Sequence, residues 1–221
     1  MSASHNKLIT AAARTHLSPF GCTQKGRSRT WLLDRAWFVS VVEFQPSGFG
    51  KGTFLNVGAH FLWTDQEHLS FDLGYRVDGF EAHESDAQFA EVADRYARRA
   101  LAELQSLDAK LSHPGAAAQV LPKSTGFDLA VRLNRAISHA LADETDAAAR
   151  LLESLVSRPR SDDWQRKLGA HCSELLAWLH EPGRFRPCIA AMIDEHRRGL
   201  GLPAKPEWVA ASLKPQPRAP D

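Results

Sequence analysis

Hydrophobic and polar residues alternate strictly between Leu69 and Val77. Every second side chain there is apolar or aromatic, and the residues between them are serine, aspartate, glycine and arginine. A period of two is typical of a strand with one buried face. Related patterns precede this segment. The sequence therefore predicts four consecutive strands, at Arg27 to Leu33, Trp37 to Phe44, Phe54 to Trp63 and Leu69 to Val77.

Short connections between these segments favour an antiparallel meander. Asp34-Arg35 is predicted to form a tight first turn, Pro46 to Gly52 a glycine-rich second loop, and Thr64 to His68 a third. Centring each loop symmetrically sets the register of the strands. The pairs expected on the apolar face are Val41 with Val57, Val39 with Ala59, Phe61 with Phe71, and Val57 with Tyr75.

The opposite face is expected to be open and more polar. The same register sets Arg29 against Ser40, Trp31 against Phe38, Asn56 against Arg76, and His60 against Asp72. Directly opposed residues have Cβ atoms about 4.5–5.5 Å apart, so the His60 imidazole is expected to reach the Asp72 carboxylate. The predicted binding surface consists of Arg29, Trp31, Asn56, His60, Asp72 and Arg76.

Helical patterns lie on both sides of the predicted strands. Residues 3–17 have a modest apolar stripe, and Ser85 with Gln88 three residues later is typical of a capping box at the start of another helix. We expect this second helix to cover the apolar face of the sheet. Its apolar stripe is Phe89, Val92, Tyr96, Ala100, Leu101, Leu104 and Leu107.

The chain beyond Gly126 is helical in pattern, after a linker from His113 to Gly126 that is rich in proline and glycine. A turn at Asp143 to Asp146 predicts a helical hairpin, and Ser161 is expected to cap a further helix. A last helix is predicted from about Pro187 to Arg198, and the proline-rich tail after Leu213 is expected to be disordered.

These elements predict an α+β fold. It consists of a four-stranded antiparallel β-meander covered on one face by helices, followed by a C-terminal helical hairpin or bundle. The expected domains are an antiparallel-sheet domain at residues 1–112 and a helical region at residues 127–213, packed on or beside it.

Composition and charge exclude several classes of protein. A formal net charge of +1 argues against a dedicated binder of nucleic acid or of membrane surfaces, because such proteins carry a basic excess. Three cysteines without a CxxC pair indicate reduced thiols in a cytoplasmic protein rather than a disulfide framework. No apolar run approaches the roughly 20 residues of a membrane span, and the N-terminus lacks the features of a signal peptide.

Several short motifs resemble a bacterial family. They are Phe20-Gly21, Lys25-Gly26-Arg27, Trp31, Glu43-Phe44-Gln45-Pro46-Ser47 and Phe54-Leu55-Asn56-Val57-Gly58. Together they resemble the uncharacterised family catalogued as domain of unknown function 4304, over about residues 5 to 110. The resemblance implies an N-terminal helix, an antiparallel sheet and a following helix. It implies no activity and no catalytic residues.

Motifs for phosphate or metal binding fail on spacing. The loop from Ser47 to Thr53 resembles a phosphate loop, but it joins two strands and lacks the required glycine spacing. His171-Cys172 with Glu174, and the acidic loop at His83, match no known ligand pattern. We therefore predict no metal and no cofactor.

Two functions remain open. The first is a non-catalytic binding or protein-interaction module that uses the open sheet face, on which arginine and aromatic residues are typical of binding hot spots. The second is a hydrolase or transferase acting on a small anionic substrate, with His60 and Asp72 as weak catalytic candidates. A solvated cross-strand pair is the commoner role for two such residues, so the sequence favours the first function, with another protein or a small anionic ligand as the partner.

Overall fold

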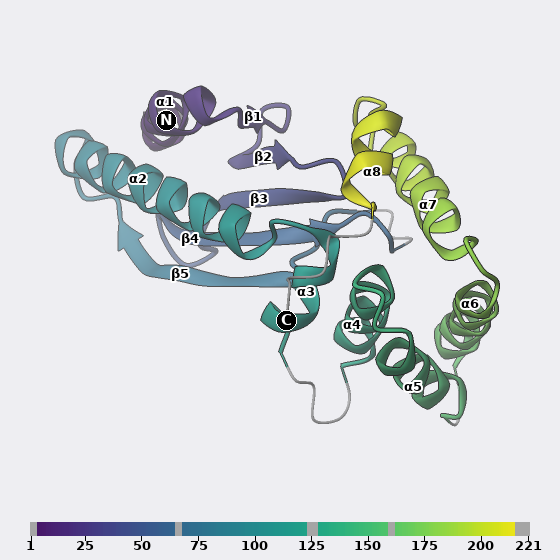
Figure 1. The fold of residues 1–221 in the computed structure, drawn as a ribbon. Coiled ribbons are helices and arrows are strands. Elements are labelled where there is room, and N and C mark those ends of the chain that lie inside the picture. Colours follow the sequence, from purple (N-terminus) through teal and green to yellow (C-terminus); the bar gives the residue numbers. More distant parts are fainter. Residues whose placement is uncertain (1–3, 65–67, 123–127, 159–161, 215–221) are drawn as a thin grey trace. The chain divides into compact units, whose positions relative to one another are not determined.

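The computed structural model describes residues 4–64, 68–122, 128–158 and 162–214. The fold is α+β, with an antiparallel sheet and helices on both sides of it in the sequence (Figure 1). The chain divides into two compact units. The sheet unit comprises Met1–His60 and Ser70–Ala109, and the helical unit comprises Phe61–Leu69 and Lys110–Asp221.

The sheet has five strands in the order β1-β2-β3-β4-β5, one more than the sequence predicted. The additional strand, β1, is only two residues long, too short to show an alternating pattern. Two helices complete this unit. The elements are α1 (Ser4–Leu17), β1 (Thr23–Gln24), β2 (Thr30–Asp34), β3 (Phe38–Gln45), β4 (Gly52–Phe61), β5 (Leu73–Ala82) and α2 (Asp86–Lys110).

The predicted register between the last two strands is confirmed. Asn56 pairs with Arg76 and Val57 with Tyr75, and the ladder ends at Ala59 with Leu73. β5 begins later than expected, so Phe71 precedes the strand and does not form the predicted ladder pair with Phe61. The predicted third loop includes residues 65–67, which lie outside the described residues.

The predicted register of the first hairpin is wrong. Trp31 pairs with Val42 and not with Phe38, because the turn is centred two residues later than Asp34-Arg35. The Asp34 carboxylate accepts a hydrogen bond from the Ala36 amide at 3.0 Å, and Ala36 takes a left-handed backbone conformation with a φ of 67°. Asp34 thereby stabilises a longer turn by bonding to a backbone amide two residues ahead.

The predicted pairing of side chains between β3 and β4 is also wrong, because the residues expected on one face of the sheet lie on opposite faces. The Asn56 side-chain amide donates to Glu43 Oε2 and to Gln45 Oε1, each at 2.9 Å, so these three residues share a face. By alternation Val41 lies on that face too, away from Val57. Gly52 belongs to β4, which leaves a connecting loop of one residue fewer than predicted. A change of one residue moves every side chain of a strand to the other face.

α2 packs on the sheet face that carries Val57 and Tyr75 (Figure 1). The Tyr96 hydroxyl donates to the Gly79 carbonyl oxygen at 2.7 Å, and the Tyr75 hydroxyl donates to the Glu103 carboxylate. The predicted apolar stripe is buried except at Leu101, which is half-buried. Each large apolar side chain fully buried in this way contributes about 1.5–3 kcal/mol.

The helical unit contains the helices α3 to α8. The predicted hairpin corresponds to α4 and α5, and the predicted later helices correspond to α6 and α7. Ser161, expected to cap α6, lies outside the described residues, and Asp162 forms a capping box with Gln165 instead. The helices are α3 (Ala117–Val120), α4 (Leu129–Leu141), α5 (Thr145–Val156), α6 (Asp163–His180), α7 (Phe185–Gly199) and α8 (Pro206–Ser212).

The predicted linker is partly ordered. It contains the short helix η2 (Pro114–Ala116) and α3, and its residues 123–126 lie outside the described part of the chain, as does the tail at 215–221. Ser138 of α4 holds this segment, because its hydroxyl donates to the Pro114 carbonyl oxygen at 2.7 Å and accepts from the Ala118 amide at 2.7 Å. Within the residues described, no helix is long and apolar enough to cross a membrane.

Candidate functional site

The six residues of the predicted binding surface lie in three different environments. Arg29 and Trp31 are on the helix-covered side of the sheet, His60 and Asp72 are buried, and Asn56 and Arg76 lie on the surface. The sequence therefore predicted two pairs correctly, Asn56 with Arg76 and His60 with Asp72. It was wrong in placing both pairs on one exposed surface.

Arg29 attaches the N-terminal helix to the sheet. Its guanidinium donates to Asn6 Oδ1 at 2.6 Å and to the Gly52 carbonyl oxygen at 3.1 Å, and it also contacts the His5 imidazole. Burial lowers the pKa of the Arg29 guanidinium, and burial together with the Arg29 charge lowers the pKa of His5. These contacts occupy Arg29 and remove it from the candidate surface.

Trp31 belongs to the core and not to an open face. Only 2% of the residue is exposed, and it lies opposite Val42 in the ladder. Its Nε1 has no hydrogen-bond partner among the described residues. The expectation that Trp31 contributes to a binding surface is wrong, because the sequence assigned the faces of β3 and β4 incorrectly relative to each other.

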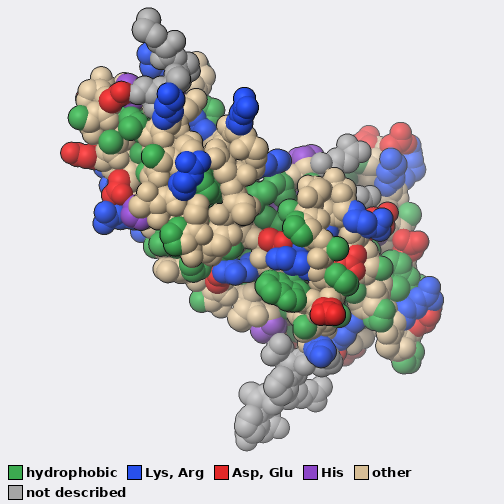
Figure 2. All heavy atoms as spheres, turned by 90° about the horizontal axis from the view of Figure 1, so that it is seen from above, with side chains coloured by type: hydrophobic (Ala, Val, Ile, Leu, Met, Phe, Trp, Pro, Cys, Tyr) green, Lys and Arg blue, Asp and Glu red, His purple; other side chains and the backbone are tan. Residues whose placement is uncertain are grey.

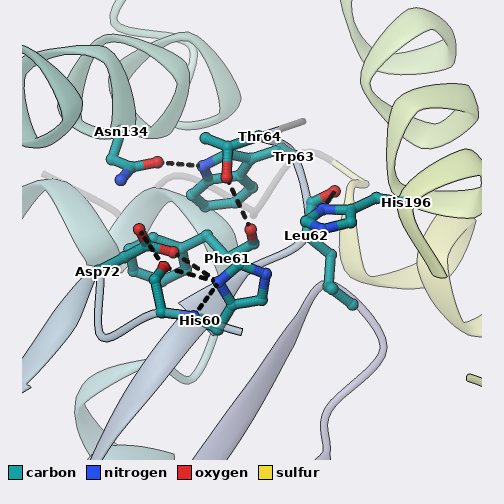
Figure 3. Close-up of polar contacts among 9 residues, drawn as sticks. His60, Phe61, Leu62, Trp63, Thr64, Asp72, Asn134 and His196 are labelled. Carbon is teal, nitrogen blue, oxygen red and sulfur yellow. Dashed lines mark hydrogen bonds and ion pairs between the residues drawn. The ribbon is translucent and has the colours of Figure 1, made fainter. Parts of the chain in front are cut away.

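His60 and Asp72 do meet, as expected, but in the interior of the sheet unit (Figure 3). The side chain of His60 is 0% exposed and that of Asp72 is 4% exposed. Asp72 Oδ2 lies 3.2 Å from Nδ1 of His60, and Ser70 Oγ lies 3.0 Å from the same nitrogen. The Ser70 hydroxyl also donates to Asp72 Oδ1 at 3.1 Å.

This geometry differs from that of a catalytic triad. A triad places the nucleophile and the carboxylate on opposite nitrogens of the histidine ring, so that one orients the ring while the other gives up its proton. Here Ser70 and Asp72 contact one and the same nitrogen. The three residues form a buried polar cluster that joins the end of β4 to the segment before β5. Ser70 was missed by the sequence analysis, although its spacing of two from Asp72 would have placed it on the same face.

Arg76 is the centre of the exposed polar patch. Its guanidinium donates to Gln45 Oε1 at 2.8 Å and to Asn56 Oδ1 at 3.4 Å, and its Cζ atom lies 4.1 Å from the centre of the Phe54 ring. The hydrogen-bond partners of this cation are thus neutral amides, and its face stacks on an aromatic ring. Such an arginine is pre-oriented and keeps its positive charge available to a ligand.

Exposed aromatic side chains flank Arg76 on β5 and in the segment just before it. Phe71 is 41% exposed, Tyr75 52% and Phe80 39%. Phe71 lies against the paired glycines Gly58 and Gly74, because a Cβ atom added at Gly58 would stand 2.5 Å from its Cδ1 atom. A depression of about 380 Å³ lies beside it, lined by Asn56, Phe71, Gly74, Tyr75 and Arg76.

These residues make up the β5 surface, which consists of Asn56, Phe71, Tyr75, Arg76 and Phe80. β5 is the last strand of the sheet and pairs with β4 on one side. An edge strand presents backbone N–H and C=O groups that an added strand can pair with. Asn56 and Arg76 were predicted from the sequence to belong to a binding surface, whereas Phe71 and Tyr75 were predicted on a buried face. Alternation alone does not reveal that β5 is the last strand or that it begins after Phe71.

The surface charge is mixed. Lys and Arg side chains are interspersed with Asp and Glu over the face drawn in Figure 2, in agreement with the formal net charge of +1. Within the part of the chain that is described, no group of three or more His, Cys, Asp or Glu residues is arranged to hold a metal ion.

Comparison of the chain with protein-family models, with curated proteins and with solved structures finds no match.

Proposed function

We propose that the sheet unit is a non-catalytic protein-interaction module that binds an extended, acidic segment of a partner protein along the edge of β5. The observation that carries this proposal is the position of Arg76. It lies on the terminal strand of the sheet, pre-oriented by Gln45 and stacked on Phe54, between exposed aromatic side chains.

The edge of β5 supports an extended partner. Peptides that add a strand to a sheet gain affinity from main-chain hydrogen bonds and specificity from alternate side chains. β5 is ten residues long, twice the length of β2. Tyr75 and Arg76 point to opposite faces of the strand, so an added strand has an aromatic contact on one side and a cation on the other.

The charge of Arg76 supports an acidic partner. A carboxylate from the partner would form charge-assisted hydrogen bonds with the guanidinium, which are about twice as strong as neutral ones. Arginine and aromatic residues together are the usual composition of interface hot spots. Tyr75 is held in place by the hydrogen bond to Glu103, which raises the pKa of its phenol and keeps the phenol neutral.

The alternative of a hydrolase or transferase has weaker support. His60 and Asp72 are buried, and Ser70 and Asp72 contact the same ring nitrogen of His60. A substrate would have to reach a side chain that is 0% exposed. We assign the three residues to the architecture of the sheet unit.

A reducing compartment, the cytoplasm, fits the cysteines and forms part of the proposal. Cys22, Cys172 and Cys188 are all free thiols. Burial raises the pKa of the Cys22 thiol to about 11, which keeps it protonated and unreactive. The likeness to domain of unknown function 4304 remains a prediction from the sequence motifs and adds no activity to the proposal.

The test uses a displayed library of linear 12-residue peptides selected against the full chain. The proposal predicts enrichment of peptides that alternate acidic with β-branched or aromatic residues. The best peptide is expected to bind Arg76→Glu at least about tenfold more weakly, because one charge-assisted contact is replaced by a repulsion. Trp208→Ala removes an aromatic residue of the helical unit that is 60% exposed, and it is the control for loss of an exposed residue away from β5. Selected peptides that bind Arg76→Glu with unchanged affinity would contradict the proposal.

A further inference from the structure

Two adjoining hollows lie in the helical unit, independent of the proposed function of the sheet unit. The first, the acidic hollow, has a volume of about 220 Å³ and is lined by Thr64, His171, Glu174, Trp178, Met192, Glu195 and His196. The second, the apolar hollow, has a volume of about 460 Å³ and is lined by Thr64, Leu129, Ala130, Leu133, Trp164, Lys167, Leu168 and His171. Thr64 and His171 line both, so the two hollows are neighbours.

Helical spacing explains how these side chains come together. His171, Glu174 and Trp178 are at positions i, i+3 and i+7 of α6, which share one face. Glu195 and His196 follow Met192 by three and four residues on α7 and likewise share a face. α6 thus lines the apolar hollow with residues from Trp164 to His171 and the acidic hollow with residues from His171 to Trp178.

Thr64, which lines both hollows, belongs to the Phe61-to-Thr64 segment, and hydrogen bonds hold this segment in place (Figure 3). Trp63 Nε1 donates to Asn134 Oδ1 at 2.8 Å, and the Thr64 hydroxyl donates to the Phe61 carbonyl oxygen at 3.1 Å. His196 Nδ1 lies 3.3 Å from the Leu62 carbonyl oxygen. A site with walls held in this way is pre-formed, as small-molecule sites usually are.

The lining of the acidic hollow selects for a cation. Glu174 and Glu195 are exposed and, among the described residues, neither forms an ion pair. Trp178 offers an aromatic face, which attracts ammonium groups, and Met192 offers a flexible side chain that can adapt to a ligand. The apolar hollow offers the leucines and Trp164, which favour a hydrocarbon or aromatic body. Lys167 there is exposed, and its long side chain can extend into solvent.

We infer that the helical unit binds a small organic amine with an apolar body. The ammonium group lies in the acidic hollow near Glu174 and Glu195, and the body lies past His171 against Leu133 and Leu168. The two volumes together fall in the range of about 300–1,000 Å³ that is typical of sites for small ligands.

The test is isothermal titration of the full chain with three probes of similar size: 2-phenylethylamine, 2-phenylethanol and 3-phenylpropionate. The inference predicts that the amine binds at least about tenfold more tightly than the alcohol or the carboxylate. Tighter binding of the carboxylate would assign the site to anions held by Lys167 and would overturn the inference. Absence of binding of all three probes at millimolar concentration would overturn it as well.

Two variants of equal charge locate the site. Glu174→Gln with Glu195→Gln is expected to weaken binding of 2-phenylethylamine by about tenfold, since both carboxylates facing the ammonium group are neutralised. Glu153→Gln with Glu207→Gln makes the same change in net charge at exposed positions that do not line either hollow, and is expected to leave binding within about twofold. Equal weakening in both variants would show that the amine is attracted by net charge alone and would overturn the assignment.

Discussion

Asp72 lies with its Oδ2 atom 3.2 Å from Nδ1 of His60, on a ring nitrogen that also contacts the Ser70 hydroxyl. The pair joins the end of β4 to the segment before β5 in the interior of the sheet unit. It therefore acts on the stability of the strand that carries the proposed binding surface and not on a substrate.

Replacement of Asp72 by alanine is expected to destabilise the protein by about 1–3 kcal/mol, because His60 and Ser70 lose a buried hydrogen-bond partner. Urea denaturation followed by circular dichroism measures this change. Glu91→Ala, on the exposed side of α2, serves as the control and is expected to change stability by less than about 0.5 kcal/mol. Equal stability of the Asp72 variant and the wild type would mean that the buried cluster is not formed in solution.

His5 and Arg29 predict a dependence of stability on pH. Burial and the neighbouring Arg29 lower the pKa of His5 below its ordinary value of 6.5, so the unfolded chain binds a proton more readily than the folded one. The stability that neutral His5 contributes is present above pH 6.5 and is lost as the pH falls below that value. His5→Gln retains an acceptor for Arg29 without titrating.

The unfolding midpoint in urea, measured between pH 7.5 and 5.5, checks this prediction. The wild type is expected to lose more stability on acidification than His5→Gln does. The ring of His83 lies 5.7 Å from that of His5, and His83 is present in both proteins, so the comparison isolates the substitution at His5. A loss of the same size in both proteins would show that His5 is not the group responsible.

The stability of Trp31 variants, measured by urea denaturation, shows whether Trp31 lies on the covered face of the sheet. Trp31→Ala is expected to cost about 3–5 kcal/mol, the usual effect of removing a large buried aromatic side chain. Trp31→Phe is expected to cost much less, because it keeps most of the packing and removes a buried indole N–H that has no partner among the described residues. A stable Trp31→Ala variant with impaired peptide binding would restore the exposed position predicted from the sequence.

Gly58 and Gly79 both lie in strands of the sheet but differ in the space available for a side chain. A Cβ atom added at Gly58 would lie 2.5 Å from the Leu73 carbonyl oxygen and from Phe71, whereas one added at Gly79 meets nothing within 4 Å. Gly58→Ala is expected to destabilise the sheet unit by about 1–3 kcal/mol and to displace Phe71. Gly79→Ala is expected to stay within about 0.5 kcal/mol of the wild type. Thermal denaturation of both variants measures this difference, and equal stability of the two variants would contradict the close approach of Gly58 to Gly74.

The sequence predicted the last hairpin better than the first for a physical reason. The alternation in β4 and β5 is strong, and it correctly set Asn56 against Arg76 and brought His60 to Asp72. The first hairpin depends on a left-handed Ala36 stabilised by Asp34, and no pattern of hydrophobic residues signals that conformation.

The candidate site was only partly predictable. One residue fewer in the loop between β3 and β4 moved Trp31 to the covered face, and a shift of one residue is below the accuracy of centring a loop. The exposure of Phe71, Tyr75 and Phe80 depends on β5 being at the edge of the sheet. Strand order is set by tertiary pairing, so the sequence pattern of β5 alone could not provide it.

Backbone hydrogen exchange of β5 measures whether a bound peptide pairs with this edge strand. The amide protons of Leu73–Ala82 are measured in the free protein and with a saturating amount of the best selected peptide. Pairing of the peptide with the edge strand predicts slower exchange at alternate amides of β5, and loss of this protection in the Arg76→Glu variant. Protection confined to the helices, with β5 exchanging as in the free protein, would contradict the account.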